Sequence, residues 1–419
     1  MGKFNYEVRD INLAKSGLEK IEWAYRNMPV LRAIEAELIE KQPFAGLKIS
    51  VSVHVEAKTA CLARALARGG AEVALTGCNP LSTQDDVAAG LASLDIMNVY
   101  AVHGDDEDHY WNRLRSALAF KPDIVIDDGG DFAMLLHSEL KDLVPNIMGG
   151  CEETTTGVHR LEILKKQNKL SYPVIAVNDA RCKHLFDNRF GTGQSVWTAI
   201  MATTNLVVAG KTVVVAGYGM CGRGVAMRAK GLGAKVIVTE VDPVKACEAL
   251  MEGYSVMTMD EAAPLGDFFV TVTGCKDVIV GRHFNMMKDG AICCNAGHFD
   301  CEVNVKQLAE LAVSEKELRN NIMGYELSNG NTICIIADGR LVNLASGDGH
   351  PVEIMDMSFA LQAQSARYIA SQKERLPIDV YQTPEVIDNR VAEILLETKN
   401  LNYDRLTEEQ YRYINSWDF

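Results

Sequence analysis

Three glycines near the middle of the chain have a spacing that suits phosphate binding. Gly217, Gly219 and Gly222 form G-x-G-x-x-G directly after an apolar run at 212–216. In this spacing the first glycine allows a tight turn, the second lets the backbone approach a pyrophosphate, and the third lets a helix pack on a strand. The free N–H groups at the start of that helix then favour phosphate oxygens. A lone motif of this kind also fits an ordinary glycine-rich turn, so its surroundings decide its meaning.

The surroundings of these glycines are those of a dinucleotide site. An Ala-rich segment follows the motif, and a second apolar run at 235–239 ends in Glu240, 18 residues after Gly222. An acid at about this distance accepts hydrogen bonds from the adenosine ribose. Because the residue is Glu rather than Arg, the pattern favours NAD over NADP. The sequence therefore predicts an NAD-binding domain in the middle of the chain.

Polar clusters with chemically useful side chains follow other apolar runs. They are HVEAKT at 54–59, DDGGD at 127–131, EETTTG at 152–157 and NDARCKHLFDNRFGTGQS at 178–195. Functional residues of parallel sheets collect at the carboxyl ends of strands, which favours a site built from these clusters. Taken singly, each has an ordinary structural interpretation: a core histidine, a solvated turn, a helix N-cap or a surface lysine.

The apolar periodicity predicts how these clusters are positioned. Strand-like runs at 47–53, 71–76, 98–102 and 123–127 alternate with helical patterns at 58–68 and 87–94, the latter capped by Ser82. Two helices precede them within 10–42, the second starting after Pro29. Later strands are expected at 268–272, 291–295 and 332–336, and helices at 351–371 and 385–399. The predicted fold is α/β, with two Rossmann-like doubly wound parallel-sheet domains and a small C-terminal tail. The first domain is expected to comprise residues 1–182 together with 352–384. The second is expected at 183–351, and the tail at 385–419.

Composition excludes several classes of partner. The chain has 419 residues, 47% of them hydrophobic, and a formal net charge of −14, which argues against nucleic acid or an anionic membrane surface. The first ten residues are polar, with no signal-peptide core, and no apolar run approaches membrane-spanning length. Eleven cysteines without C-x-x-C pairs are expected to be reduced thiols of a cytoplasmic protein. Nine dispersed histidines without ligand spacing predict no metal site.

The ordered motifs resemble the S-adenosyl-L-homocysteine hydrolase family over nearly the whole chain. They are His54 with Thr59-Ala60, NPLSTQDD at 79–86, DDGGD, EETTTG, Lys183 with FDN at 186–188, GYG..G.G at 217–224, TGC at 273–275, GHFD at 297–300, and GRLVNL with GHP between 339 and 351. The resemblance implies reversible hydrolysis of the thioether of S-adenosyl-L-homocysteine to adenosine and L-homocysteine. It also implies one tightly bound NAD per subunit, recycled each turnover, and a homotetramer.

The resemblance also implies roles for individual residues. Oxidation of the ribose 3′-hydroxyl makes carbon 4′ acidic, so that a base can remove its proton and the thiolate can leave; water then adds and the ketone is reduced. Asp128 is the implied base at carbon 4′, assisted by His54, and Lys183 with Asp187 is the implied pair at the 3′-oxygen. The full implied catalytic set is His54, Asp128, Glu153, Lys183, Asp187, Asn188 and His298. Further substrate contacts are expected from Glu56, Lys58, Thr59, Asn343, Asp348 and His350. Cofactor contacts are expected from Thr154, Thr155, Thr156, Asn188, Gly217, Gly219, Gly222, Glu240, Thr273, Gly274, Gly297, His298 and Asn343.

The chain departs from the better-known branch of the family near the expected base site. That branch has Thr and then Glu or Gln where this chain has Glu56 and Lys58, often Cys in place of Thr192, and an apolar residue in place of Asp348. A lysine donates hydrogen bonds and accepts none, so Lys58 with Asp348 would suit hypoxanthine and S-inosyl-L-homocysteine. Alternatively, Lys58 pairs with Glu56 or Asp348 and never meets the base. The tail ends without the Lys- and Tyr-bearing extension that reaches a neighbour's NAD site in many members.

Two other classes of function stay open at this point. An ordinary NAD-dependent dehydrogenase that releases NADH would carry the same central glycine motif. A regulatory NAD-binding protein without catalysis would also carry it, although the presence of His54, Asp128, Lys183 and Asp187 argues against that interpretation.

Overall fold

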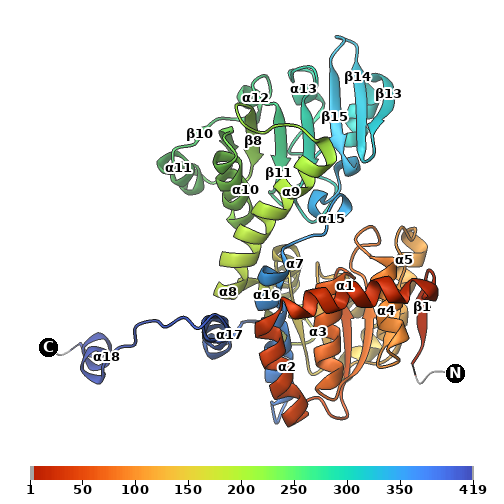
Figure 1. The fold of residues 1–419 in the computed structure, drawn as a ribbon, viewed down its shortest axis with the longest axis vertical. Coiled ribbons are helices and arrows are strands. Elements are labelled where there is room, and N and C mark those ends of the chain that lie inside the picture. Colours follow the sequence, from red (N-terminus) through yellow and green to blue (C-terminus); the bar gives the residue numbers. More distant parts are fainter. Residues whose placement is uncertain (1–3, 418–419) are drawn as a thin grey trace.

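Two parallel-rich sheets, each covered by helices, form the two lobes of the molecule (Figure 1). The computed structural model describes residues 4–417. The lower lobe in Figure 1 holds most of the first half of the chain and the upper lobe holds the middle. Both sheets have eight strands, so the prediction of two α/β domains with parallel sheets is confirmed.

The first sheet has the strand order β1-β4-β3-β2-β5-β6-β7-β16, and all its described pairs are parallel. Its strands are β1 (Tyr6–Val8), β2 (Lys48–Ser52), β3 (Glu72–Thr76), β4 (Asn98–Ala101), β5 (Ile124–Asp127), β6 (Gly149–Glu152), β7 (Val174–Ala176) and β16 (Val380–Gln382). Its helices are η1 (Ile11–Leu13), α1 (Ala14–Arg26), α2 (Pro29–Lys41), α3 (Ala57–Arg68), α4 (Asp85–Ser93), α5 (Glu107–Ala119), α6 (Asp131–His137), η2 (Lys141–Asn146) and α7 (Thr155–Lys166). The central strands are buried on both faces, as expected of a sheet covered by helices on each side.

The second sheet has the order β10-β9-β8-β11-β12-β15-β14-β13. Its strands are β8 (Thr212–Ala216), β9 (Lys235–Thr239), β10 (Ser255–Val256), β11 (Phe268–Thr271), β12 (Ile292–Asn295), β13 (Ala312–Arg319), β14 (Ile322–Leu327) and β15 (Thr332–Ile336). Its helices are α10 (Met220–Gly231), α11 (Pro243–Met251), α12 (Met259–Ala262), α13 (Gly281–Phe284), α14 (Val305–Leu311), η5 (Ala337–Gly339) and α15 (Val342–Ala345). Strands β13 and β14 are antiparallel, a feature that the sequence did not predict.

Each sheet has a central point between two parallel strands where the strand order reverses. In the first sheet this point lies between β2 and β5, and in the second between β8 and β11. Ligands of open α/β sheets bind outside the carboxyl ends of the strands at such points. His54 follows β2, Asp128 follows β5 and the glycine motif follows β8. The topology therefore puts His54 and Asp128 at the reversal point of the first sheet and the glycine motif at that of the second.

Two long crossings join the lobes (Figure 1). The first runs through η3 (Val177–Asp179), α8 (Arg181–Lys183), the π-helix η4 (His184–Gly191) and α9 (Thr192–Thr204). The second runs back through α16 (Val352–Ala370), which packs against β5 and β6. The chain then passes through α17 (Glu385–Thr398) and ends in an extended arm that carries α18 (Glu408–Asn415). The last two residues of the predicted tail, 418–419, lie outside the described residues.

Most predicted elements lie within a few residues of the observed ones, but the proposed cap at Ser82 is wrong. The N-cap of α4 is Gln84 and the helix begins at Asp85. The Ser82 hydroxyl instead donates to the carbonyl of Asn79 and contacts His54. Across residues 4–417, no helix has both the length and the apolar character that a membrane span requires.

Candidate functional site

The glycine motif leaves open space where a cofactor would approach. Gly217 has a φ of 101°, which favours glycine, and its amide donates to the carbonyl of Thr239 at 2.8 Å. A Cβ on Gly222 would lie 1.9 Å from the carbonyl oxygen of Gly217, so the start of α10 packs on the turn only without a side chain. A Cβ on Gly219 would meet no atom within 4 Å. This geometry fits a pyrophosphate that lies against Gly219.

Glu240 stands at the end of β9, beside the glycine turn. One carboxylate oxygen accepts from the amide of Tyr218 at 2.6 Å. The other accepts from the amides of Val241 and Asp242 at 2.7 and 3.1 Å. These bonds hold the carboxylate at the mouth of the motif, where an adenosine ribose would lie.

Lys183 is the centre of a buried polar cluster in the first crossing. Its Nζ donates to Oδ1 of Asn188 at 2.8 Å and lies 3.3 Å from Oδ2 of Asp187 and 3.4 Å from Oε1 of Glu153. Asn188 follows Lys183 by five residues, so the π-helical turn of η4 brings the two onto one face. Four residues that the sequence predicted as catalytic therefore meet at one ammonium group.

The pKa values in this cluster follow from charge as well as burial. Burial opposes the ammonium form of Lys183, but the carboxylates of Asp187 and Glu153 outweigh it and raise its pKa. Burial likewise opposes the carboxylate of Asp187, but Lys183 and His350 outweigh it and lower its pKa. For Glu153 burial dominates and raises the pKa to about 7, although Lys183 acts against it. Glu153 is thus the member of the cluster that titrates near neutral pH.

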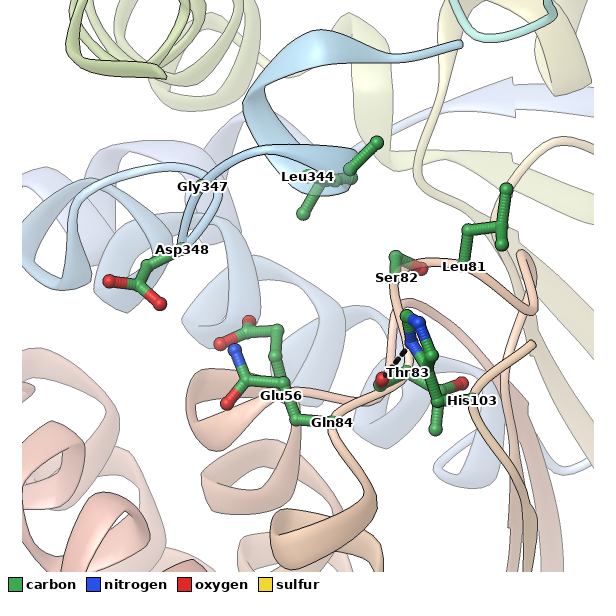
Figure 2. Close-up of a pocket in the computed structure, with 10 residues that line it drawn as sticks. Glu56, Leu81, Ser82, Thr83, Gln84, His103, Leu344, Gly347 and Asp348 are labelled. Atoms are coloured by element: carbon green, nitrogen blue, oxygen red, sulfur yellow. Dashed lines mark hydrogen bonds between the residues drawn. The ribbon is translucent and has the colours of Figure 1, made fainter. Parts of the chain in front are cut away.

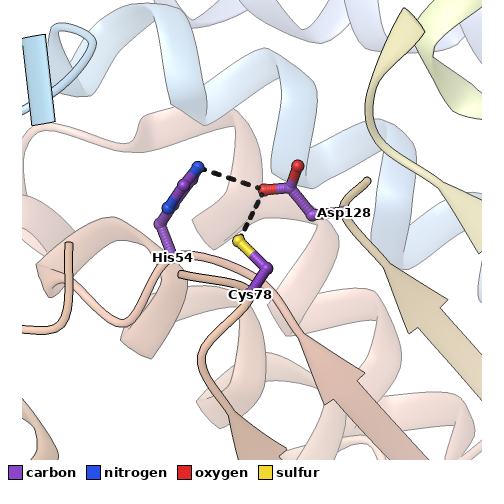
Figure 3. A group of neighbouring side chains, drawn as sticks. All are labelled: His54, Cys78 and Asp128. Carbon is purple, nitrogen blue, oxygen red and sulfur yellow. Dashed lines mark hydrogen bonds and ion pairs between the residues drawn. The ribbon is translucent and has the colours of Figure 1, made fainter. Parts of the chain in front are cut away.

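A second polar cluster, His54 with Cys78 and Asp128, lies at the reversal point of the first sheet (Figure 3). Oδ2 of Asp128 lies 3.6 Å from Nε2 of His54 and accepts from the Cys78 thiol at 3.4 Å. The Ser82 hydroxyl lies 2.6 Å from Nδ1 of His54. The sequence did not single out Cys78, although it directly precedes the NPLSTQDD motif. An imidazole, a thiol and a carboxylate are also possible metal ligands, and these atoms lie within 4.8 Å of one another.

Burial sets the protonation states of this second cluster. It lowers the pKa of His54 to about 3, with His350 and Lys58 adding to the effect, so the imidazole is neutral at neutral pH. Burial raises the pKa of Asp128, with His298 acting against it. Burial and Asp128 raise the pKa of Cys78 well above its ordinary value, so Cys78 remains a thiol that can donate.

His298 comes from the upper lobe and closes over the second cluster. A Cβ on Gly129 would lie 2.4 Å from Nε2 of His298, and Gly129 has a φ of 101°. The ring centroids of His54 and His298 are 6.3 Å apart. Only a glycine at 129 allows the loop after β12 to come this close to the end of β5.

Lys58 lies at the other side of the site, at the start of α3. Its Nζ donates to the carbonyls of Asp348 and His350 at 2.8 and 2.9 Å and lies 3.1 Å from Oε2 of Glu56. All three N–H groups of the ammonium therefore have acceptors. Asp348 takes part through its backbone, and its side chain is exposed. Thr59 is buried behind this pair, 3.5 Å from Glu56.

A cavity of about 280 Å³ opens between the two lobes (Figure 2); Lys58 does not line it, but its partners Glu56 and Asp348 do. Its lining residues are Glu56, Leu81, Ser82, Thr83, Gln84, His103, Leu344, Ala345, Gly347 and Asp348. The imidazole of His350 points elsewhere: Nδ1 lies 2.7 Å from Oδ1 of Asp187 and Nε2 lies 3.2 Å from the Thr192 hydroxyl. Its side chain thus belongs to the Lys183 cluster, while its carbonyl belongs to the Lys58 side.

The remaining predicted cofactor residues lie in four segments: the start of α7, the loop after β11, the loop after β12, and α15. Thr154 caps α7 by accepting from Gly157 at 3.2 Å, Thr155 donates to Asn178, and Thr156 lies in the first turn of α7. The carboxylate of Glu302 accepts from the amides of Thr273 and Gly274 at 2.9 and 2.8 Å, and a Cβ on Gly297 would lie 1.8 Å from it. Asn343 donates to Ser195 at 3.0 Å, and its buried Oδ1 has no hydrogen-bond partner in the described part of the chain. The sequence motifs assigned no role to Glu302, although only Cys301 separates it from the GHFD motif.

The orphaned buried oxygens mark where a ligand would bind. Among the described residues they include Oδ1 of Asp128, Oε1 of Glu153 and Oδ1 of Asn343. Buried acceptors without donors are costly, and hydroxyl or amide donors of a ligand would satisfy them. Together with the open space at Gly219, these acceptors fit a nicotinamide cofactor and a ribose between the two clusters.

Comparison with known families agrees with this geometry. The model described as S-adenosyl-L-homocysteine hydrolase matches residues 5–146, and the one described as S-adenosyl-L-homocysteine hydrolase, NAD binding domain, matches residues 188–349. The S-inosyl-L-homocysteine hydrolase of Methanocaldococcus jannaschii is 56% identical over 98% of this chain and 99% of its own length. The chain belongs to the S-adenosyl-L-homocysteine hydrolase family.

Other members of the S-adenosyl-L-homocysteine hydrolase family are nearly as similar. The adenosylhomocysteinase of Pyrococcus abyssi is 54% identical over 99% of this chain and 98% of its own length. The S-inosyl-L-homocysteine hydrolase of Methanococcus maripaludis is 53% identical over 98% of each chain. NAD is the cofactor of this S-adenosyl-L-homocysteine hydrolase family member, and its NAD-binding module carries the glycine motif at 217–222.

Proposed function

We propose that this chain hydrolyses the thioether of an S-nucleosyl-L-homocysteine, with S-adenosyl-L-homocysteine as the lead substrate. The products are the nucleoside and L-homocysteine, and the reaction is reversible. The observation that carries the proposal is the pairing of two buried polar clusters, one around Lys183 in the crossing between the lobes and one around Asp128 at the reversal point of the first sheet. One cluster suits oxidation of a ribose hydroxyl and the other suits proton abstraction beside it.

The Lys183 cluster handles the proton of the 3′-hydroxyl. Bound NAD supplies the acceptor for a hydride and later returns it. The ammonium of Lys183 orients the 3′-oxygen, and the lysine alone is a poor base because its pKa is raised. Glu153, with a pKa of about 7 and Oε1 at 3.4 Å from Nζ, is placed to take the proton that passes through Lys183.

The Asp128 cluster handles the carbon–sulfur bond. Oxidation at carbon 3′ makes the hydrogen at carbon 4′ acidic, and Asp128 removes it as a carboxylate. Neutral His54 lies 3.6 Å away and is placed to relay that proton from Asp128 to the leaving sulfur, which restores the carboxylate, and to relay a proton in the reverse direction when water adds. His298 lies above Gly129 and keeps solvent from this end of the site.

The decisive test of this function is its redox balance. Purified enzyme is expected to carry NAD and to release homocysteine without added cofactor. Absorbance at the NADH band should rise to at most one equivalent per subunit and then stay constant, while homocysteine, measured by thiol titration, continues to accumulate. NADH that accumulates in step with product would contradict the hydrolase and support an ordinary dehydrogenase.

S-inosyl-L-homocysteine is the second candidate substrate, and the position of Lys58 is the observation in its favour. The ammonium of Lys58, whose partners Glu56 and Asp348 line the 280 Å³ cavity, could donate to the 6-oxo group of hypoxanthine but cannot accept from the amino group of adenine. Glu56, which lines the same cavity, offers a carboxylate acceptor to either base. Against this candidate, the three N–H groups of Lys58 already have acceptors, and the side chain of Asp348 is exposed.

Replacement of Lys58 by glutamine is expected to shift base preference. In Lys58→Gln the amide can accept as well as donate, so kcat/KM for the adenosyl compound should rise relative to the inosyl compound by about five- to hundredfold. The measurement is kcat/KM for both compounds in the parent and the variant. Lys316→Gln, on the exposed strand β13, is the matched control. An unchanged ratio in Lys58→Gln would show that Lys58 does not contact the base.

We propose that the chain acts as a homotetramer and that its C-terminal arm lies between subunits. The arm extends away from both lobes (Figure 1), and Leu401, Leu406, Tyr411, Ile414 and Trp417 are exposed along it. Light scattering measures the oligomeric state.

We further propose that residues 1–182 and 352–384 together form one domain, that 183–351 form the second, and that 385–419 form the tail. All eleven cysteines are free thiols, which supports a reducing compartment such as the cytoplasm.

A further inference from the structure

Helix α16 contacts both carboxylates that flank Lys183. The Ser358 hydroxyl donates to Oδ2 of Asp187 at 2.6 Å, and the Gln362 amide donates to Oε2 of Glu153 at 2.5 Å. Both side chains are fully buried. They are four residues apart, one helical turn, and so lie on the same face of α16.

These two bonds decide which oxygens are left for the site. With Oε2 of Glu153 held by Gln362, Oε1 faces Nζ of Lys183 at 3.4 Å and has no hydrogen-bond donor among residues 4–417. With Oδ2 of Asp187 bonded to Ser358, Oδ1 faces His350. The two oxygens of Glu153 are thus divided between α16 and Lys183, whereas Oδ2 of Asp187 accepts from Ser358 and also lies 3.3 Å from Nζ of Lys183.

The donors also offset a repulsion between the carboxylates. Asp187 and Glu153 both approach one ammonium group, and in a buried site their negative charges repel each other. The hydrogen bond from Gln362 favours the ionised form of Glu153 and lowers its pKa. Neutral hydroxyl and amide donors do this without adding a charge that would compete with Lys183.

Helix α16 is itself held in place near these two residues. Asp356, buried two residues before Ser358, accepts from the amides of Val30 and Leu31 at 2.9 and 2.7 Å. This contact fixes α16 to the start of α2, within the first lobe. The donors therefore come from a rigid element, whereas Lys183 and Asp187 belong to the crossing between the lobes.

We propose that Ser358 and Gln362 are positioning residues for the oxidation step, which they serve by fixing Asp187 and Glu153 on either side of Lys183. The inference rests on the proposed function, because it assigns the Lys183 cluster to the 3′-hydroxyl. Neither residue touches the reacting atoms. Their effect is on the orientation and ionisation of the carboxylates, so it should be confined to hydride transfer and its reversal.

The test uses NAD-loaded enzyme and stopped-flow absorbance at the NADH band in single turnovers. Gln362→Met is expected to slow reduction of bound NAD by about ten- to hundredfold. It should also move the acid limb of that rate to higher pH, because the lost hydrogen bond lowered the pKa of Glu153. Ser358→Ala is expected to slow the same step without moving the acid limb, because Lys183 and His350 still hold the pKa of Asp187 low.

Two matched controls lie on the same helix. Gln364→Met changes a half-buried glutamine whose described side-chain contact is with Arg367, and Ser365→Ala changes a fully buried serine whose hydroxyl has no described partner. Both are expected to reduce NAD at the parental rate. Gln362→Glu keeps the size of the side chain and tests the hydrogen bond itself. Its rate of NAD reduction should approach the parental rate as pH falls, because a protonated carboxyl at position 362 can donate to Glu153 again.

The outcomes separate this inference from the proposed function. The positioning role is wrong if Gln362→Met and Ser358→Ala reduce NAD at the parental rate. It is also wrong if the control variants show as large a decrease in that rate as these two variants. If the parent enzyme neither reduces nor reoxidises bound NAD with the adenosyl or inosyl compound, the proposed function itself is wrong. If Gln362→Met does not fold, the pH-dependent rescue of Gln362→Glu decides: a defect that is constant with pH overturns the proposal.

Discussion

Asp128→Asn enzyme is expected to reduce its bound NAD when substrate is added and then to stop. The Lys183 cluster is untouched by this change, so oxidation of the 3′-hydroxyl proceeds. The amide cannot take the proton from carbon 4′, so homocysteine is not eliminated. Loss of a positioned general base typically costs about 10²–10⁴-fold, and turnover should fall by that amount.

The measurement compares two signals from the same sample. NADH absorbance should reach about one equivalent per subunit, while thiol titration detects almost no homocysteine. Asp142→Asn, an exposed aspartate in η2, is the control for the chemical change alone and should behave as the parent. Release of homocysteine at the parental rate by Asp128→Asn would mean that Asp128 is not the base.

Lys183→Met enzyme is expected to fail one step earlier, with no reduction of NAD. The thioether side chain cannot orient the 3′-oxygen or pass on its proton, so the rate of NADH formation should fall by about 10²–10⁴-fold. Because the cation is lost from between Asp187 and Glu153, the pKa of Glu153 should rise further above 7. Breaking a buried ion pair also costs about 3–5 kcal/mol in free energy of unfolding.

Stability and chemistry are measured separately for this variant. Denaturant unfolding gives the loss of stability, and stopped-flow absorbance on the folded fraction gives the rate of NAD reduction. Lys165→Met, on the exposed side of α7, is expected to change neither the stability nor the rate of NAD reduction strongly, because its partner Asp379 is at the surface. Normal NAD reduction in Lys183→Met would remove Lys183 from the oxidation step and leave Glu153 as the candidate base.

Local sequence patterns were enough to predict the two lobes. The strands β2, β5 and β8 are short runs of buried apolar residues, and such runs need no knowledge of their neighbours to be recognised. The glycine motif with Glu240 is equally local, because turn geometry and helix start depend on adjacent residues. Strand β13 was missed because it is an exposed edge strand with the sequence AVSEKELR, whose charges hide its strand character.

The contacts of the site depended on tertiary structure. Lys58 donates to the backbone carbonyls of Asp348 and His350, which lie about 290 positions further along the chain. Neither segment predicts this pairing by itself. The thiol of Cys78 meets Asp128 only because β3 and β5 flank β2 in one sheet.

The sequence by itself determined the cofactor module, the polar clusters and, through their order, the family. Only the tertiary structure decided which side chains hold those clusters in place. Ser358 and Gln362 lie in a helix whose pattern predicts nothing beyond burial, and their partners are 171 and 209 residues away. Residue type and spacing describe what a side chain can do, whereas the partner that it meets is set by the packing of α16 against β5 and β6.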